Sequence, residues 1–167
     1  MNFRGLTWRI YTSSAIIKLM LKNFKVRIFP TKAQETKLEN NLELCRELWN
    51  AGLEQRLLLW KEKRTGCSYF SQANELKLLK QARPDFKSVN SQVLQNTLER
   101  LDLAFKAFFR RVKKGETPGY PRFRGKGRYN SLTWVQSGFG FKNNHLRLSK
   151  IGFLKIHLHQ EPEGKIK

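Results

Sequence analysis

The chain is poor in cysteine and in acidic residues, and it lacks a long hydrophobic run. Its two cysteines, Cys45 and Cys67, do not form a disulfide framework or a zinc site, so a reducing, intracellular setting fits. No apolar stretch has the length of a membrane span. Ile16 and Ile17 are followed by Lys18 and by no cleavage-site pattern, which argues against a signal peptide. We therefore expect a cytoplasmic protein with no membrane partner.

The scarcity of acids leaves a large excess of positive charge. The 167 residues include 33 Lys and Arg against 13 Asp and Glu, a formal net charge of +20. Such a charge opposes compaction and favours a polyanionic partner. Ten of the thirteen acids lie between Glu35 and Asp102, whereas residues 103–160 hold thirteen Lys and Arg and one acid, Glu116. The sequence predicts a mixed-charge middle followed by a cationic C-terminal part.

The few acids are not placed for catalysis. Metal-assisted cleavage of a phosphodiester needs carboxylates that converge on a divalent ion. Glu35, Glu39 and Glu43 are spaced as one solvent-facing stripe of a helix. Glu161 and Glu163 flank a proline and are typical of a solvated turn. We predict no catalytic residue, no metal site and no cofactor.

Two histidines leave one alternative open. His157 and His159 would share a face of a strand and could bind a metal ion, although an exposed strand face is the commoner reason for such a pair. No serine or cysteine has neighbours that would activate it as a nucleophile.

Hydrophobic periodicity predicts one strand followed by helices. Apolar and basic residues alternate over 24–28, and Pro30 ends this strand. Thr31 and Gln34 have capping-box spacing and open a helix that stops before Gly66. Its apolar stripe, at steps of three and four residues, is Leu38, Leu42, Cys45, Trp49, Leu53, Leu57 and Trp60.

Two further helices follow. The first is expected over 71–81, before Pro84, and the second from 88–91 to a C′ glycine at Gly115. Long helices that share apolar stripes pack as a small bundle. The stripe of the last helix is Leu94, Leu98, Leu101, Phe105, Phe108 and Val112.

After Gly115 the pattern changes to an irregular basic loop and short strands. Asn143-Asn144 is expected to be the turn of a hairpin. One strand before the helices and several after them predict one β domain with a helical insertion, preceded by an extension, 1–19, with little fixed structure. The strand-like runs are 131–136, 139–141, 145–148 and 153–159.

The segment 105–130 combines nine basic residues with six aromatic rings and a single acid. A phosphate backbone and unstacked bases attract such a mixture, whereas the plainer interpretation is a solvated basic loop. Phe105 and Phe108 keep helical phase and are assigned to the core; Phe109 does not, and stays undecided. We predict that phosphates are contacted by Arg110, Arg111, Lys113, Lys114, Arg122, Arg124, Lys126 and Arg128, with Lys25 and Arg27 from the first strand.

Six sequence blocks carry a resemblance to a known family. They are FKVRIFPT (24–31), LELCRELWN (42–50), SQVLQNTLERLDLAFKAFFRRVKKG (91–115), PGYPRF (118–123), LRLSKIG (146–152) and EGKIK (163–167). In this order they resemble the N-terminal half of the TnpB/OrfB transposon-encoded proteins, often labelled helix-turn-helix transposases. The third and fourth blocks are the most specific.

The resemblance implies an RNA-guided DNA endonuclease related to type V CRISPR effectors, which binds a guide RNA and cuts DNA beside a short motif. It implies an α+β fold, an OB-like, wedge-type β-barrel interrupted by an inserted helical bundle. On this basis residues 20–30 and 116–167 form the wedge-type domain and 31–115 the helical recognition domain. A RuvC-like nuclease with three acidic ligands and a four-cysteine zinc module would follow in the family.

This chain departs from the family because it ends at EGKIK, before the nuclease. We expect a truncated product that is not an enzyme. It would bind guide RNA and target-adjacent DNA, in the cytoplasm and at the nucleoid when DNA-bound. The alternatives are a helix-turn-helix module that reads transposon ends and a non-functional pseudogene product.

The resemblance also indicates which positions contact bases. Tyr120 or Phe123 would stack on them. Trp134 would either stack or fill the barrel, and we favour the barrel. Gln and Asn side chains suit the edge of adenine in the major groove. Alternatively, Ser91 caps its helix and Gln95 and Asn96 are only its polar face. The candidates for reading a DNA motif are Tyr69, Ser91, Gln95, Asn96, Gln136 and Ser137.

Overall fold

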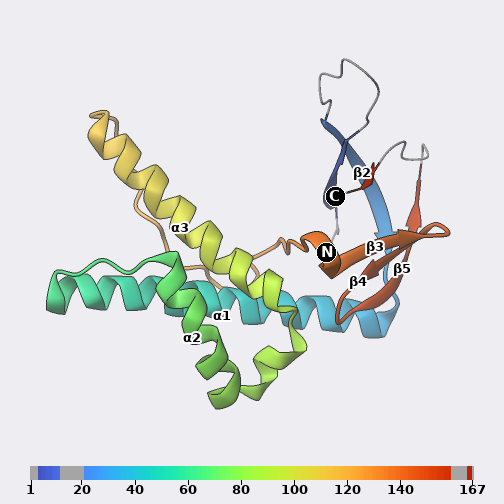
Figure 1. The fold of residues 1–167 in the computed structure, drawn as a ribbon, viewed down its shortest axis with the longest axis horizontal. Helices are drawn as coiled ribbons and strands as arrows, with labels where there is room; N and C mark the ends of the chain where they lie inside the picture. Colours follow the sequence, from blue (N-terminus) through green and yellow to red (C-terminus); the bar gives the residue numbers. More distant parts are fainter. Residues whose placement is uncertain (1–3, 12–20, 159–164, 167) are drawn as a thin grey trace. The chain divides into compact units, whose positions relative to one another are not determined.

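The structure, a computed structural model, describes residues 4–11, 21–158 and 165–166 (Figure 1). Its fold is α+β, as predicted, and the described residues form three α-helices and one six-stranded antiparallel sheet. The chain divides into two compact units. The β unit comprises Met1–Lys37 and Trp134–Lys167, and the helical unit comprises Leu38–Thr133.

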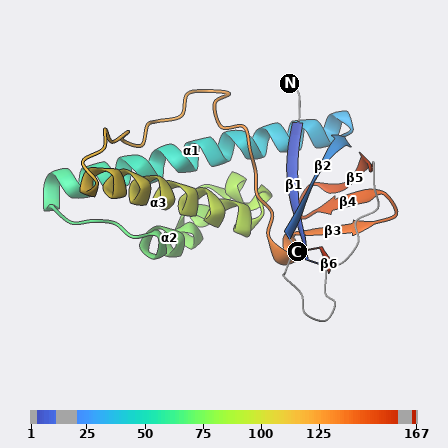
Figure 2. The ribbon, with the colours of Figure 1, turned by 90° about the horizontal axis from the view of Figure 1, so that it is seen from above.

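The β unit is built on an open sheet with the strand order β3-β4-β5-β2-β1-β6 (Figure 2). In the second strand Val26 and Ile28 are buried while Lys25 and Arg27 are exposed, as the alternating sequence predicts. The strands are β1 (Arg4–Tyr11), β2 (Leu21–Phe29), β3 (Phe139–Lys142), β4 (His145–Leu148), β5 (Gly152–His157) and β6 (Lys165–Ile166), and a 3₁₀ turn, η2 (Gln136–Gly138), precedes β3.

The predicted hairpin is present between β3 and β4. Asn143 and Asn144 have φ values of +47° and +55°. Positive φ at both central residues is the requirement of a type I′ turn, which asparagine tolerates better than most residues. The first helix also begins as predicted, because the Thr31 amide donates to Gln34 Oε1 (3.0 Å) and the Gln34 amide to Thr31 Oγ1 (3.4 Å).

The expected β-barrel is not formed by the described strands. A barrel requires every strand to pair on both sides. Within the residues described, β3 pairs with β4 alone and β6 with β1 alone. The sheet therefore ends at two edges.

Two further expectations for the β unit are corrected. Residues 4–11, expected to have little fixed structure, form β1 and pair along β2; their RGLTWRIY sequence holds the aromatic and β-branched residues that favour strands. Residues 131–136, expected as a strand, are irregular up to η2. Side-chain contacts hold this segment instead of a ladder, since Arg100 donates to Ser131 O (3.1 Å) and Trp134 Nε1 donates to Ser149 O (3.3 Å).

The helical unit contains most of α1 (Lys32–Lys63), followed by α2 (Tyr69–Ala82), the 3₁₀ turn η1 (Pro84–Ser88) and α3 (Ser91–Lys113). None of the helices in the described chain is long and apolar enough to cross a membrane. Leu53 of α1 and Leu98 and Leu101 of α3 are fully buried, as their spacing predicts. Gly52 lets the helices approach closely, because a Cβ there would lie 3.1 Å from Leu101 Cδ2.

The C-terminus of α3 is closed as predicted. Gly115 has φ +67°, and its amide donates to Val112 O (3.1 Å) while the Glu116 amide donates to Arg111 O (3.0 Å). These two bonds are the Schellman motif. They fix the direction in which the chain leaves the helix.

The C-terminal ends of α1 and α3 are not buried. Trp60 and Val112, assigned to apolar stripes, are 56% and 49% exposed. Figure 1 shows α1 and α3 diverging toward these ends, so the stripes continue past the point where the helices pack. A polar network crosses the packed part: Arg56 donates to Gln72 Oε1 (2.9 Å) and to Asp102 Oδ1 (3.0 Å).

Candidate nucleic-acid interface

Residues 116–128, which we name the basic loop, lie against α1 through main-chain atoms. The Arg122 carbonyl accepts a hydrogen bond from Trp49 Nε1 (3.1 Å). The Arg124 carbonyl accepts from Asn50 Nδ2 (2.9 Å) and Arg46 Nη1 (3.1 Å), and its amide donates to Asn50 Oδ1 (2.7 Å). Because the backbone bonds of Arg122 and Arg124 point toward α1, the side chains of residues 122–128 remain exposed. The sequence analysis had assigned residues 116–133 to the β domain, whereas these contacts place them in the helical unit.

The cationic side chains of the basic loop are exposed and unneutralised. Arg122, Lys126 and Arg128 form no ion pair with any carboxylate in the described part of the chain. The Arg124 guanidinium lies 5.0 Å from the centre of the Trp49 ring and is exposed at its other side. Gly127, with φ +72°, turns the chain between Lys126 and Arg128. The loop thus presents positive charge that the described residues leave uncompensated.

The last turns of α3 add a second group of cations. Arg110, Arg111, Lys113 and Lys114 are exposed, and among the described residues only Lys114 of these four approaches a carboxylate, that of Glu116 at 4.0 Å. The negative end of the helix dipole accounts for some preference for basic residues here. It does not account for the cations of the loop. The loop starts beside this turn, because a Cβ built at Gly119 would lie 3.7 Å from Arg111 Nη1.

The aromatic residues of this region divide into packed and open rings. Tyr120 packs edge-on against Phe105 (5.6 Å between centroids) and Phe108 (5.0 Å), and burial raises its pKa. Phe105 is buried, as predicted for a core residue. Phe109 is 57% exposed but lies 5.1 Å from Phe108. Phe123 is 55% exposed, so a large part of its ring is accessible to a base.

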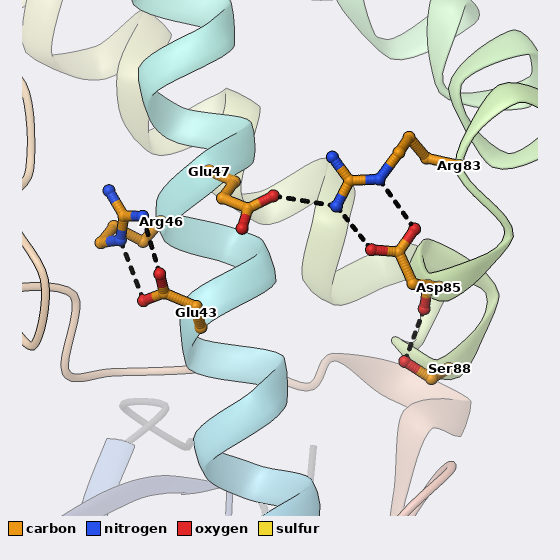
Figure 3. Close-up of polar contacts among 6 residues, drawn as sticks. All are labelled: Glu43, Arg46, Glu47, Arg83, Asp85 and Ser88. Carbon is orange, nitrogen blue, oxygen red and sulfur yellow. Dashed lines mark hydrogen bonds and ion pairs between the residues drawn. The ribbon is translucent and has the colours of Figure 1, made fainter.

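Glu43, Glu47 and Asp85 of the helical unit are bound to arginines (Figure 3). Glu43 accepts two hydrogen bonds from Arg46 (2.7 and 2.9 Å), and these bonds, with a smaller contribution from the charge of Lys126, lower the pKa of Glu43. Arg83 bridges Glu47 (3.0 Å) and Asp85 (2.6 Å), which lowers the pKa of Asp85. These acids carry negative charge that is already matched.

No group of three or more His, Cys, Asp or Glu side chains could hold a metal ion among the residues the structure describes. His157 is in β5, but His159, Glu161 and Glu163 lie outside the described residues.

The base-reading candidates of the helical unit lie away from these cations. Asn96 and Arg111 are separated by about 22 Å along α3 at the rise of an α-helix. The N-cap of α3 is Asn90, whose side chain accepts from the Gln92 amide (2.8 Å). Ser91 is therefore not the cap; its hydroxyl accepts from Lys80 Nζ (2.7 Å).

Of the same candidates, Asn96 donates to Glu99 (3.2 Å), Gln95 is exposed, and Tyr69 begins α2 with its ring 5.2 Å from Phe70. Tyr69 is at the start of α2, whereas Ser91, Gln95 and Asn96 are on the first turns of α3. These candidates therefore do not form one site.

The remaining candidates belong to the β unit. Lys25 and Arg27 are exposed on β2, and Gln136 and Ser137 lie in η2, where the Ser137 side chain is exposed. Trp134 is 9% exposed and fills the interior of the β unit. Trp134 thus takes the interior position that the sequence analysis favoured, and its ring is not open to a base.

Sequence analysis missed the residues that hold the basic loop. Trp49 was assigned to an apolar stripe, and its buried Nε1 required a partner that the sequence did not identify. Directly after the basic loop, Tyr129 is buried. Its hydroxyl donates to Thr97 Oγ1 (3.1 Å) and accepts from Arg100 (3.2 Å). The available signal was a tryptophan beside an asparagine, Asn50, on one helix.

Residues 20–65, a little over a quarter of the chain, match the family HTH_OrfB_IS605, described as a helix-turn-helix domain. No curated protein matches the chain. The matched segment contains β2 and α1, which is one continuous helix, and α2 begins beyond it. The match supports an OrfB-type helix-turn-helix domain in this part of the chain, and with it a DNA-binding function related to transposases.

Proposed function

We propose that the chain binds nucleic acid through the basic loop and the last turns of α3. The observation that carries the proposal is that α1 holds the loop by its main chain while Arg122, Lys126 and Arg128 remain exposed and unpaired in the described structure. A polyanion supplies the missing negative charge. Lys and Arg displace the counterions of phosphates, and this release makes binding favourable and dependent on salt.

Phe123 extends the same surface to bases. Its open ring lies between Arg122 and Arg124 in sequence, so a nucleotide could stack on it while its phosphate meets a guanidinium. The resemblance to TnpB/OrfB proteins favours a guide RNA as the main ligand and target-adjacent DNA as the second. We propose binding without cleavage, since Glu43 is held by Arg46 and Glu116, the one acid of the basic loop, lies alone beside Lys114.

A second candidate function has its own observation. Helix α2, the turn η1 and helix α3 follow one another, with Ser91, Gln95 and Asn96 on the first turns of α3. A helix-turn-helix protein reads the major groove with the first turns of its second helix. Under this alternative the chain would read transposon ends as duplex DNA through α3.

The test compares charge removal at two places. One variant replaces Arg122, Lys126 and Arg128 with Gln. A control variant with the same net charge replaces the exposed Lys61, Lys63 and Lys77 with Gln. Binding to a structured RNA and to a duplex is measured by fluorescence anisotropy at several salt concentrations. The first variant should reduce the slope of log K against log salt by about 2 to 3, and the control by much less.

Equal effects of the two variants would refute a localised interface. A greater loss for duplex DNA after Gln95→Ala and Asn96→Ala than after loop substitution would favour the helix-turn-helix alternative. Cleavage of either ligand by this chain with magnesium would refute binding without catalysis.

A further inference from the structure

One face of the sheet in the β unit is turned to solvent. In β2 Lys25, Arg27 and Phe29 are exposed, and the residues between them are buried. In β5 Phe153 and Lys155 are exposed, and the alternate residues are buried. Because side chains alternate between the faces of a strand, the exposed residues share one side, which we name the outer sheet face.

Strand register aligns the residues of the outer sheet face in rows. Phe29 is opposite Lys155, Lys155 is opposite His145, and His145 is opposite Lys142. This row crosses four strands, with about 5 Å between directly opposed side chains. The neighbouring row contains Phe153, Arg147 and Gly140.

The outer sheet face combines positive charge with open rings. Strands β2, β3, β4 and β5 contain no Asp or Glu. Phe29 and Phe153 are 45% and 58% exposed, and the Arg27 guanidinium lies 5.3 Å from the centre of the Phe29 ring. Exposed phenylalanine rings do not help to keep a protein in solution. Two such rings among cations therefore indicate a binding partner that has both π surfaces and negative charge.

Gly140 leaves space within the second row. A Cβ built at this position would meet no atom within 4 Å, and its φ is not positive. The row therefore continues from Phe153 and Arg147 to a position without a side chain. This opening leaves room beside the Arg147 cation for a planar group that is stacked on Phe153.

We propose that the outer sheet face binds unpaired nucleotides of single-stranded nucleic acid, with bases stacked on Phe29 and Phe153 and phosphates at Arg147 and Lys155. The ligand is a single strand rather than a duplex because paired bases keep their faces inside the stack. This surface belongs to the β unit, whereas the basic loop belongs to the helical unit. The proposal goes beyond the function proposed for the helical unit.

The test uses the full chain and a labelled oligothymidylate of about sixteen nucleotides. Gly140→Glu and Gly140→Lys make substitutions of similar size and opposite charge at the same open position. The glutamate variant should bind more weakly than the native chain and the lysine variant more tightly. Phe153→Leu should weaken binding about tenfold, because it keeps an apolar side chain but removes the ring.

A second readout reports stacking itself. An oligonucleotide containing 2-aminopurine should lose fluorescence on binding the native chain, and Phe153→Leu should reduce this loss at saturation. Circular dichroism verifies that the variants fold. Weakening by both Gly140 variants to the same extent, or unchanged binding and quenching for Phe153→Leu, would overturn the proposal.

Two controls separate this proposal from its alternatives. The Arg122, Lys126 and Arg128 variant should keep its sensitivity to Phe153→Leu, so failure of the basic loop as an interface would leave this result intact. Vesicles containing phosphatidylserine test the other polyanionic surface. If Phe153→Leu abolished vesicle binding and left oligothymidylate binding unchanged, the face would bind membranes and the proposal would be wrong.

Discussion

The attachment of the basic loop to α1 can be tested by Asn50→Ala. The substitution removes two hydrogen bonds, from Asn50 Nδ2 to Arg124 O (2.9 Å) and from the Arg124 amide to Asn50 Oδ1 (2.7 Å). Each bond contributes about 0.5–1.5 kcal/mol. The groups are exposed, so water replaces part of the loss, and we expect about 1 to 2 kcal/mol of loop ordering to disappear.

The loss of loop ordering should lower the affinity for RNA and leave the salt dependence of binding unchanged. All cations of the loop remain in Asn50→Ala, so the same phosphate contacts form once the loop is ordered. Affinity for RNA should fall about five- to thirtyfold, by conversion of 1 to 2 kcal/mol, while the slope of log K against log salt is unchanged. Fluorescence anisotropy at several salt concentrations measures both quantities.

The matched control is Asn40→Ala, at an exposed asparagine on the same helix with no recorded side-chain partner in the described structure. It should leave affinity unchanged. If Asn50→Ala lowered the salt slope as much as loss of the loop cations does, or if Asn40→Ala weakened binding equally, backbone attachment would not explain how the loop presents its charges.

Three further predictions concern stability. Asp102→Asn should cost about 3 to 5 kcal/mol in urea unfolding because it leaves the buried Arg56 without its anion, whereas Lys106→Gln, at the exposed partner, should cost less than about 1 kcal/mol. Burial opposes ionisation of Asp102, but hydrogen bonds from Lys106 and Arg56 outweigh it and lower its pKa. Its stabilisation is therefore complete above the unfolded pKa of about 3.9 and is lost as pH falls through the lower folded pKa; Asp102→Asn should flatten this part of a stability–pH curve. Gly115→Ala should cost about 1 kcal/mol in thermal unfolding because its φ is +67°, while Gly66→Ala, without positive φ, should have little effect.

Sequence periodicity predicted the helices well because burial itself produces the pattern. Leu94, Leu98 and Leu101 recur at helical spacing, and all three are buried in α3. The same rule over-extended the stripes to Trp60 and Val112, since periodicity along one helix does not reveal where its partner diverges. Local turn chemistry was equally informative, as the positive φ values of the asparagine turn and of the α3 C-terminus illustrate.

The site was less predictable, because its organisation depends on contacts between distant residues. Arg56 is a charged residue buried inside the helical unit, and its burial is explained by the positions of Gln72, Asp102 and the Phe105 ring. The bonds from Trp49 and Asn50 to the basic loop join residues more than seventy positions apart and leave no periodic signal. Composition identified the cations of the loop but not which of their atoms face α1.

The outer sheet face shows the same limit. Lys25 and Arg27 were predicted as exposed from alternation, and this is confirmed. Phe153 and Arg147, which lie on the same face in β5 and β4, could not be assigned with them, because a row across strands depends on register and strand order. Neither follows from the sequence of one strand.

Because α1 binds the main chain of Arg122 and Arg124, the path of residues 122–124 does not depend on their side chains. Carbonyl and amide groups are the same in every residue except proline, so Trp49 and Asn50 would hold a loop of different composition along the same course. Ligand preference could therefore be altered by exchanging outward side chains alone, for example to acids that would repel nucleic acid and accept a basic protein, without redesign of the helices beneath.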